Sequence, residues 1–282
     1  MKEACGLFGV FNTKNNSNIN TLNDVKLGMN LLQHRGQDGC GISYLNNTNS
    51  IVTIKNLGLV KNSFVDLPNI DTQVAIGHVR YSTSGNSKNI DHTQPLVSNN
   101  KLGDYALAHN GNLSNVFHHD SYYLVNFINS CKEKSWKEIF INMLDIIPGV
   151  YCLLILTKDG IYAIRDTYGV RPLTMGFNGN DYCVSSETSA FHRFNFYCNI
   201  NPGEIYFINK KGPKLLYSSN EKINNICSFE YIYFLRSNSV VDNLNVQVVR
   251  TNLGKTLAKK DTNQNYKRVD NWIKNETIVI GI

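Results

Sequence analysis

Residues 5–11, near the start of the chain, constrain the fold more than any other stretch. A cysteine and a glycine lead there into an apolar run, which is typical of a buried strand. If the four residues before it were removed, Cys5 would carry a thiol and an α-amine on neighbouring atoms. An α-amine with a pKa of about 8 can accept a proton near neutral pH. Cys5 is therefore either a nucleophile with its own base or a small apolar residue packed in a first strand.

The composition indicates a folded protein. The chain has 282 residues, 42% of them hydrophobic and 18% charged, which is enough for one large or two ordinary domains. The formal net charge of +6 is modest and the basic residues are dispersed, so we expect no nucleic-acid binding. An apolar run of about 20 residues and the apolar core of a signal peptide are both missing, so we expect no membrane association.

The cysteines indicate a reducing compartment. Their number is odd, they are scattered, and no two form a C-x-x-C pair; they are Cys5, Cys40, Cys131, Cys152, Cys183, Cys198 and Cys227. This pattern argues against a disulfide framework and against a self-contained zinc site. We expect a cytoplasmic protein with no cofactor within this chain.

A helix and a polar loop follow the first strand. Leu22, Val25, Met29 and Leu32 have helical spacing. The glycine-rich residues 34–41 then run into a strand over residues 42–45. This loop is either a simple helix stop and turn, or a segment that brings main chain against a ligand.

Two later segments end in residues suited to binding. Residues 74–85 alternate like a strand and contain Arg80, whose guanidinium can hold a carboxylate with two hydrogen bonds. Residues 105–109 form a further strand that runs into Asn110 and Gly111. Asn-Gly is typical of a hairpin turn. The alternative is an oxyanion hole made by the Asn110 amide and the Gly111 N–H.

The middle of the chain favours an α+β fold. Asp120 is a candidate N-cap for one helix, and Ser135 with Glu138 forms a capping box for a second, which Pro148 ends. Five strands with short turns are then predicted over residues 150–157, 161–166, 182–186, 204–210 and 215–218. Short connections favour antiparallel sheets, and helices clustered between two sets of strands favour a layered domain.

A polar stretch over residues 218–225 suggests a domain boundary. We expect one domain over residues 5–226 and an incomplete second one over residues 227–282. The second begins with a helix that carries Val246, Val249, Leu253 and Leu257. Residues 277–282 are apolar, as expected for a buried parallel strand of an α/β domain.

Four motifs together resemble the class II glutamine amidotransferases, which use an N-terminal nucleophile. They lie at residues 5–9, 34–37, 77–83 and 109–113. Residues 165–173, 185–188, 202–205 and 227–234 are similar to the amidophosphoribosyltransferase branch of that family. The resemblance implies a four-layer α-β-β-α glutaminase domain of two antiparallel sheets, followed by the opening elements of an α/β phosphoribosyltransferase domain.

The resemblance also implies roles for individual residues. Cys5 would attack the glutamine amide with its freed amine as base, and the oxyanion hole would be Asn110 and Gly111. Arg80 would bind the α-carboxylate of glutamine and Asp120 its α-ammonium. Further glutamine-binding residues would be His78 and Thr83, and the supports of the nucleophile would be Arg35 and Gly36.

The chain departs from the family pattern in two places. Only six residues separate Leu113 from Asp120, which is flanked by His119 and by Tyr122 two residues later in place of the usual Ser and Glu. Arg-Pro-Asp-Ser is replaced by Arg-Ser-Asn-Ser at residues 236–239.

The implied activity is glutamine hydrolysis that supplies ammonia for the conversion of phosphoribosyl pyrophosphate to 5-phosphoribosylamine, the first committed step of IMP synthesis. Phosphoribosyl pyrophosphate would bind only with a complete second domain. A full-length protein would use magnesium, some members carry an iron-sulfur cluster with a ligand that matches Cys227, and a homo-oligomer is compatible with the family. Two alternatives remain: a non-catalytic interaction module, and the glutaminase half of a sugar-phosphate amidotransferase, against which residues 230–233 argue.

Overall fold

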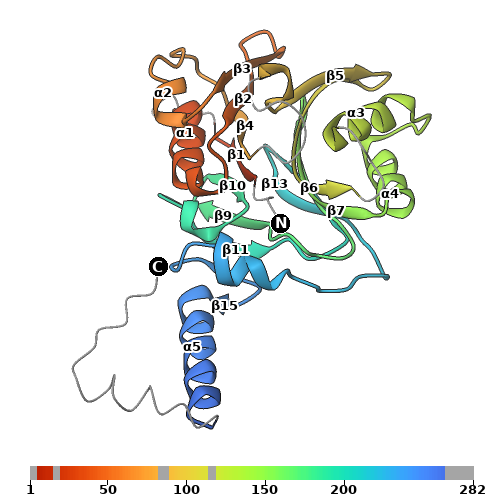
Figure 1. The fold of residues 1–282 in the computed structure, drawn as a ribbon. Coiled ribbons are helices and arrows are strands. Elements are labelled where there is room, and N and C mark those ends of the chain that lie inside the picture. The colour runs from red at the N-terminus through yellow and green to blue at the C-terminus, as the bar shows by residue number, and fades with distance from the viewer. Residues whose placement is uncertain (1–4, 15–19, 82–88, 114–118, 264–282) are drawn as a thin grey trace.

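Two antiparallel sheets face each other in the computed structural model, which describes residues 5–14, 20–81, 89–113 and 119–263 (Figure 1). The first sheet has the order β11-β9-β10-β1-β4-β2-β3 and the second β13-β12-β8-β7-β6-β5. The strands of the first are β1 (Gly6–Asn12), β2 (Gly39–Leu45), β3 (Ile51–Leu57), β4 (Val74–Arg80), β9 (Thr174–Asn178), β10 (Asp181–Ser185) and β11 (Asn195–Asn199). Those of the second are β5 (Leu96–Asn100), β6 (Gly103–Leu113), β7 (Gly149–Thr157), β8 (Gly160–Arg165), β12 (Glu204–Asn209) and β13 (Gly212–Ser218).

The central strand β1 shows why both faces of the first sheet are buried. Successive side chains of a strand point to opposite faces. Leu7 and Phe11 accordingly enter the core between the sheets, whereas Phe8 and Val10 pack on the opposite side under the helices. The continuous apolar run that begins after Cys5 is therefore required by the position of β1 in the middle of the molecule.

Helices cover the two outer faces. The first sheet is covered by α1 (Thr21–Leu31) and α2 (Val60–Ser63), and the second by α3 (Asp120–Ser130) and α4 (Trp136–Ile146) (Figure 1). The predicted N-cap Ser135 is confirmed, since the N–H of Glu138 donates to Ser135 Oγ at 3.3 Å. The reciprocal bond of a capping box is replaced, because the Glu138 carboxylate accepts from the N–H of Lys134 at 3.0 Å. These layers confirm the α+β, α-β-β-α fold predicted from the sequence.

Three local predictions are wrong. The Asn-Gly pair is not a hairpin turn: Asn110 and Gly111 lie inside β6, opposite Cys152 and Tyr151 of β7. Long-range pairing overrides the local turn preference there. Asp120 is the first residue of α3 and not its N-cap, which is His119. The strand predicted from residue 42 begins earlier, at Gly39, because the glycine-rich residues pair with β4.

The chain after β13 packs against the end of the sandwich and then leaves it. A short π-helix (Glu230–Phe234) and the hairpin β14 (Val240–Val241) and β15 (Leu244–Asn245) precede α5 (Val246–Asn263), which extends away from the sheets (Figure 1). The predicted helix is confirmed, although Leu253 and Leu257 on it are exposed. The strand expected over residues 277–282 lies outside the described residues. Within the described ranges, none of the helices combines the length and apolarity needed to cross a membrane.

Candidate functional site

A narrow pocket gathers residues from segments that are distant in the sequence. Cys5 precedes β1, Arg80 ends β4, Gly111 belongs to β6 and Asp120 begins α3, and all four line this pocket. Pairing of β1 with β4 places Gly6 opposite Val79, which brings Cys5 beside Arg80 and Tyr81. The other lining residues are Tyr81, His92, Gln94, Leu96, His109, His119, Ser121 and Tyr122.

The Cys5 thiol lines this pocket and contacts the backbone of Tyr81. Its Sγ accepts a hydrogen bond from the N–H of Tyr81 at 3.5 Å and lies 3.7 Å from the Tyr81 carbonyl oxygen. Burial raises the pKa of the Cys5 thiol to about 11, although the Tyr81 backbone contact works in the opposite direction. The thiol is therefore protonated at neutral pH, and a base must remove its proton before it can act as a nucleophile.

This raised pKa predicts how Cys5 responds to pH in the chain that still carries residues 1–4. Only the thiolate reacts with iodoacetamide, so the alkylation rate of Cys5 should rise about tenfold per pH unit from about pH 7 to about pH 10. Mass spectrometry of the labelled peptide measures this rate. In denaturant, the alkylation rate of the same peptide should stop rising above the ordinary thiol pKa of about 8.5. A plateau at that pH in the folded protein would contradict the prediction.

Arg80 places a positive charge at the pocket. Its side chain is 5% exposed, and Nη1 donates to the carbonyl oxygen of Asn89 at 3.3 Å. Burial lowers the pKa of Arg80, although the nearby Cys5 and Asp38 act in the opposite direction and raise it. Among the residues that the structure describes, no carboxylate forms an ion pair with Arg80. Such a guanidinium is suited to an anionic ligand.

Asp120 supplies the opposite charge in the same pocket. Its Oδ1 accepts from the N–H of Ser121 at 2.8 Å and lies 3.8 Å from Nδ1 of His109. Burial lowers the pKa of His109, although the charge of Asp120 raises it. The imidazole is therefore neutral at neutral pH and leaves the Asp120 carboxylate able to bind a cation. The pocket thus contains a carboxyl group, Asp120, and a guanidinium, Arg80, which are complementary to the two charges of an α-amino acid.

Asn110 and Gly111 lie where β6 passes the pocket. The Asn110 side chain does not line it, but its Nδ2 is buried and has no hydrogen-bond partner in the described part of the chain. Gly111 lines the pocket, and a Cβ on it would collide with the Val150 carbonyl oxygen on β7. The position therefore requires glycine. A buried amide donor without a partner is unfavourable, and a ligand oxygen would satisfy it.

The structure describes one of the two remaining residues predicted to bind glutamine, and it does not bring that residue, His78, into the pocket. His78 lies buried between the sheets, where its Nε2 contacts the carbonyl oxygen of His109 at 3.1 Å. Burial lowers the pKa of His78 to about 3, so this ring is neutral. His78 does not line the pocket. Thr83 lies outside the described residues.

The two predicted supports contact Cys5 and Arg80. Nε of Arg35 donates to the carbonyl oxygen of Cys5 at 3.1 Å. Gly36 packs against the backbone of Arg80 so closely that a Cβ would lie 2.5 Å from the Arg80 carbonyl carbon. Both residues follow α1, and both brace the ends of strands that lead into the pocket.

Cys227 lies apart from this pocket. Its backbone N–H donates to the Val170 carbonyl oxygen at 3.2 Å, and its thiol is free. Within the described ranges, no three His, Cys, Asp or Glu side chains converge as metal ligands. The role of Cys227 as an iron-sulfur ligand, and the use of magnesium, remain predictions about a longer protein.

Several pocket residues were not predicted from the sequence. Gln94 accepts from the N–H of His109 at 2.6 Å and donates to Ser121 Oγ at 3.0 Å, which joins β6 to α3. The rings of His92 and His119 contact each other, with centroids 3.8 Å apart and planes tilted by 46°. Local patterns carry no signal for Gln94 or His92, because both precede a strand and reach the pocket only through the packing of the second sheet.

Comparisons with known proteins agree with this geometry. Residues 78–193 match a family described as "Glutamine amidotransferase domain". The chain is 35% identical to an amidophosphoribosyltransferase of Bacillus subtilis over 92% of its own length and 57% of that protein. It is 34% identical to one of Methanocaldococcus jannaschii, over 91% of its own length and 61% of the relative.

The solved glutamine phosphoribosylpyrophosphate amidotransferase of B. subtilis, complexed with ADP and GMP, superposes with a TM-score of 0.80. That comparison has 34% identity and covers 90% of this chain and 58% of the other. The chain thus spans less than two thirds of the length of these relatives. Over most of its own length the chain is similar to the amidophosphoribosyltransferases, and part of it matches a glutamine amidotransferase domain.

Proposed function

We propose that the chain hydrolyses the side-chain amide of glutamine and that Cys5, once residues 1–4 are removed, is the nucleophile. The observation that carries this proposal is the convergence of Cys5, Arg80 and Asp120 in one pocket. These groups come from three separate segments, and each matches a different part of glutamine. The α-carboxylate binds Arg80, the α-ammonium binds Asp120, and the side-chain amide reaches the Cys5 thiol.

The reaction proceeds through a thioester. The α-amine of Cys5 takes the thiol proton, Sγ attacks the amide carbon, and the oxygen becomes negatively charged. Asn110 Nδ2 and the Gly111 N–H stabilise this oxyanion, in agreement with the unpartnered state of that amide. The proton passes to the leaving nitrogen and ammonia departs. Water then hydrolyses the thioester to glutamate, and the thiol is restored.

The fate of the ammonia is the second part of the proposal. Because the relatives are amidophosphoribosyltransferases, we propose that it converts phosphoribosyl pyrophosphate to 5-phosphoribosylamine in purine biosynthesis, at a phosphoribosyltransferase site that includes residues after 226. All seven cysteines are free, which supports work in a reducing compartment such as the cytoplasm.

The mass of the active protein tests the proposed base. The amine can serve as the base only if it belongs to Cys5, so purified protein that forms glutamate should lack residues 1–4. Intact-mass measurement, combined with a coupled glutamate assay, checks this. Protein that retains Met1 and still hydrolyses glutamine would show that another group takes the thiol proton. Protein that starts at Cys5 but forms no glutamate would contradict the glutaminase proposal itself.

A further inference from the structure

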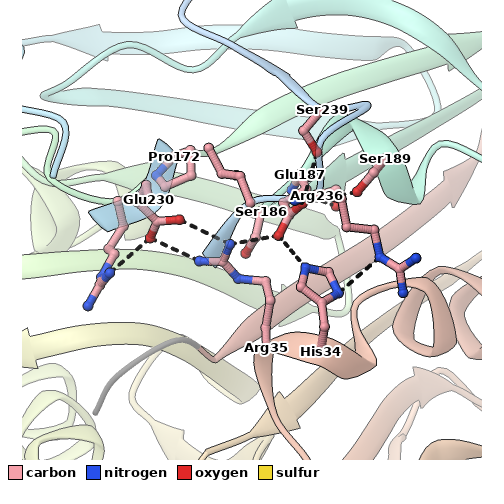
Figure 2. Close-up of polar contacts among 12 residues, drawn as sticks. His34, Arg35, Pro172, Ser186, Glu187, Ser189, Glu230, Arg236 and Ser239 are labelled. Carbon is pink, nitrogen blue, oxygen red and sulfur yellow. Dashed lines mark hydrogen bonds and ion pairs between the residues drawn. The ribbon is translucent and has the colours of Figure 1, made fainter. Parts of the chain in front are cut away.

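A buried cluster of charges, formed by Arg35, Glu187 and Glu230, contacts the backbone of Cys5 through Arg35. Figure 2 shows these three side chains. The centre of the cluster is Arg35, whose side chain is fully buried. Nε donates to the Cys5 carbonyl oxygen at 3.1 Å, so this guanidinium contacts the backbone of the nucleophile directly. The two other nitrogens bind carboxylates that come from segments far along the chain.

Glu187 and Glu230 are these two carboxylates, and both side chains are fully buried. Nη1 of Arg35 donates to Glu187 at 2.8 Å and to Glu230 at 3.1 Å, while Nη2 donates to Glu230 at 3.0 Å. Figure 2 shows the guanidinium between the two acids. Burial by itself would lower the pKa of Arg35, but the charges of Glu230 and Glu187 raise it. Every nitrogen of the planar group is therefore engaged, and its orientation is fixed.

The two acids are anchored differently. Glu187 also accepts from His34 at 2.7 Å, from Ser239 Oγ at 2.8 Å and from the N–H of Arg236 at 2.9 Å. These contacts fix its position independently of Arg35. Glu230 has a second cation instead, since Nη1 of Arg171 donates to it at 2.9 Å. Glu230 connects Arg35 directly to the short π-helix after the sandwich, whereas Glu187 connects it to residues that follow this helix.

This π-helix is tied in turn to the start of α5. Nε of Arg250 donates to the carbonyl oxygen of Tyr231 at 2.8 Å, and its Nη2 donates to that of Leu235 at 2.7 Å. Tyr231 and Leu235 also pack with Val246, the first residue of α5. A continuous set of contacts therefore runs from α5 through Glu230 and Arg35 to the carbonyl of Cys5.

We propose that Glu230 is a positioning residue for glutamine hydrolysis, which acts through Arg35 to fix the Cys5 backbone and ties the orientation of the nucleophile to the segment after the sandwich. This inference rests on the proposed glutaminase function. Within the described part of the chain, the side-chain hydrogen bonds of Glu230 go to Arg35 and Arg171 and not to Arg80 or Asp120. Its loss should therefore affect the attack by Cys5 more than the binding of glutamine.

The test is Glu230→Gln, which keeps the shape of the side chain but removes its charge. Because an error of about 1 Å in the position of a reacting group costs about a hundredfold in rate, kcat should fall between about tenfold and a hundredfold. KM for glutamine should stay within about twofold, since the proposed binding groups are untouched. In a variant that already carries Arg35→Lys, adding Glu230→Gln should lower kcat by less than about twofold, because Glu230 acts on Cys5 through Arg35.

Cys5 alkylation provides a second measurement that does not depend on glutaminase activity. A Cys5 released from Arg35 should be more exposed, so iodoacetamide should label it about threefold faster or more in Glu230→Gln. Cys131, which is half-buried like Cys5, serves as the internal reference and should not change. If the unmodified protein forms no glutamate, the proposed function fails, but the alkylation rates still decide whether Glu230 positions Cys5.

Asp242→Asn is the matched control. Asp242 binds the buried Arg165 at 3.3 Å, so this pair also links the sandwich to the later segment, but it does not touch Arg35 or Cys5. The control should leave kcat and Cys5 labelling within about twofold. If it reproduces the effect of Glu230→Gln, the role of Glu230 is merely structural and the proposal is overturned.

Folding is checked by thermal denaturation. If Glu230→Gln does not fold, Glu230→Asp keeps the charge that faces both arginines and shortens the side chain by one carbon. The proposal would then be supported if kcat falls by less than expected for Glu230→Gln and Cys5 is labelled faster than in the unmodified protein. A folded variant of either kind with unchanged kcat and unchanged labelling would overturn it.

Discussion

Replacement of Cys5 by alanine is expected to lower kcat for glutamate formation by about 10⁴-fold or more, because no other group can form the thioester. The alanine removes one sulfur atom beside Tyr81, so the sandwich should remain folded. A coupled glutamate assay on protein of verified mass measures the loss.

The control for this change is Cys131→Ala. Cys131 is half-buried like Cys5, but it follows α3 and does not line the pocket, so the variant should keep its activity within about twofold. Substantial glutamate formation by Cys5→Ala would instead mean that a different residue is the nucleophile.

The second large effect is expected for Arg80→Met, which retains most of the volume of the side chain but not its charge. The loss of one partner from a buried charge pair typically costs about 2–5 kcal/mol. The value of kcat/KM for glutamine should therefore fall by about 10²- to 10³-fold, mainly through KM, because the α-carboxylate would lose its only cation in the proposed arrangement. Initial rates over a range of glutamine concentrations separate the two constants.

Arg193→Met is the matched control for Arg80. Arg193 is also an arginine with buried carboxylate partners, Asp24 and Asp181, but it joins α1 to the first sheet away from the pocket. Its replacement should lower the melting temperature without a change in KM. Equal kcat/KM for the unmodified protein and Arg80→Met would contradict the role of Arg80, whereas no glutamate formation by either protein would favour a non-catalytic role for the whole chain.

Much of the pocket could be predicted because the order and spacing of four motifs resemble a known family, and because most of these motifs lie on or beside strands with clear local patterns. The apolar run after Cys5 predicted a buried strand, and the end of the strand at Arg80 placed that side chain at an edge. Motif order then indicated that Asp120 and Gly111 belong with them. Local signals were wrong at Asn110 and Gly111, a pair typical of turns, because pairing with β7 continues the strand through both residues.

The sequence by itself determined the layered α+β fold, since the alternation of apolar residues and the helical periodicities decide which faces must be buried. Only the tertiary structure decided what surrounds Cys5. Arg35 and Glu230 are 195 residues apart, and a buried ion pair between them leaves no periodic pattern along the chain. Gln94 and His92 reach the pocket for a similar reason, because strand order and sheet packing, not local sequence, bring them beside β6.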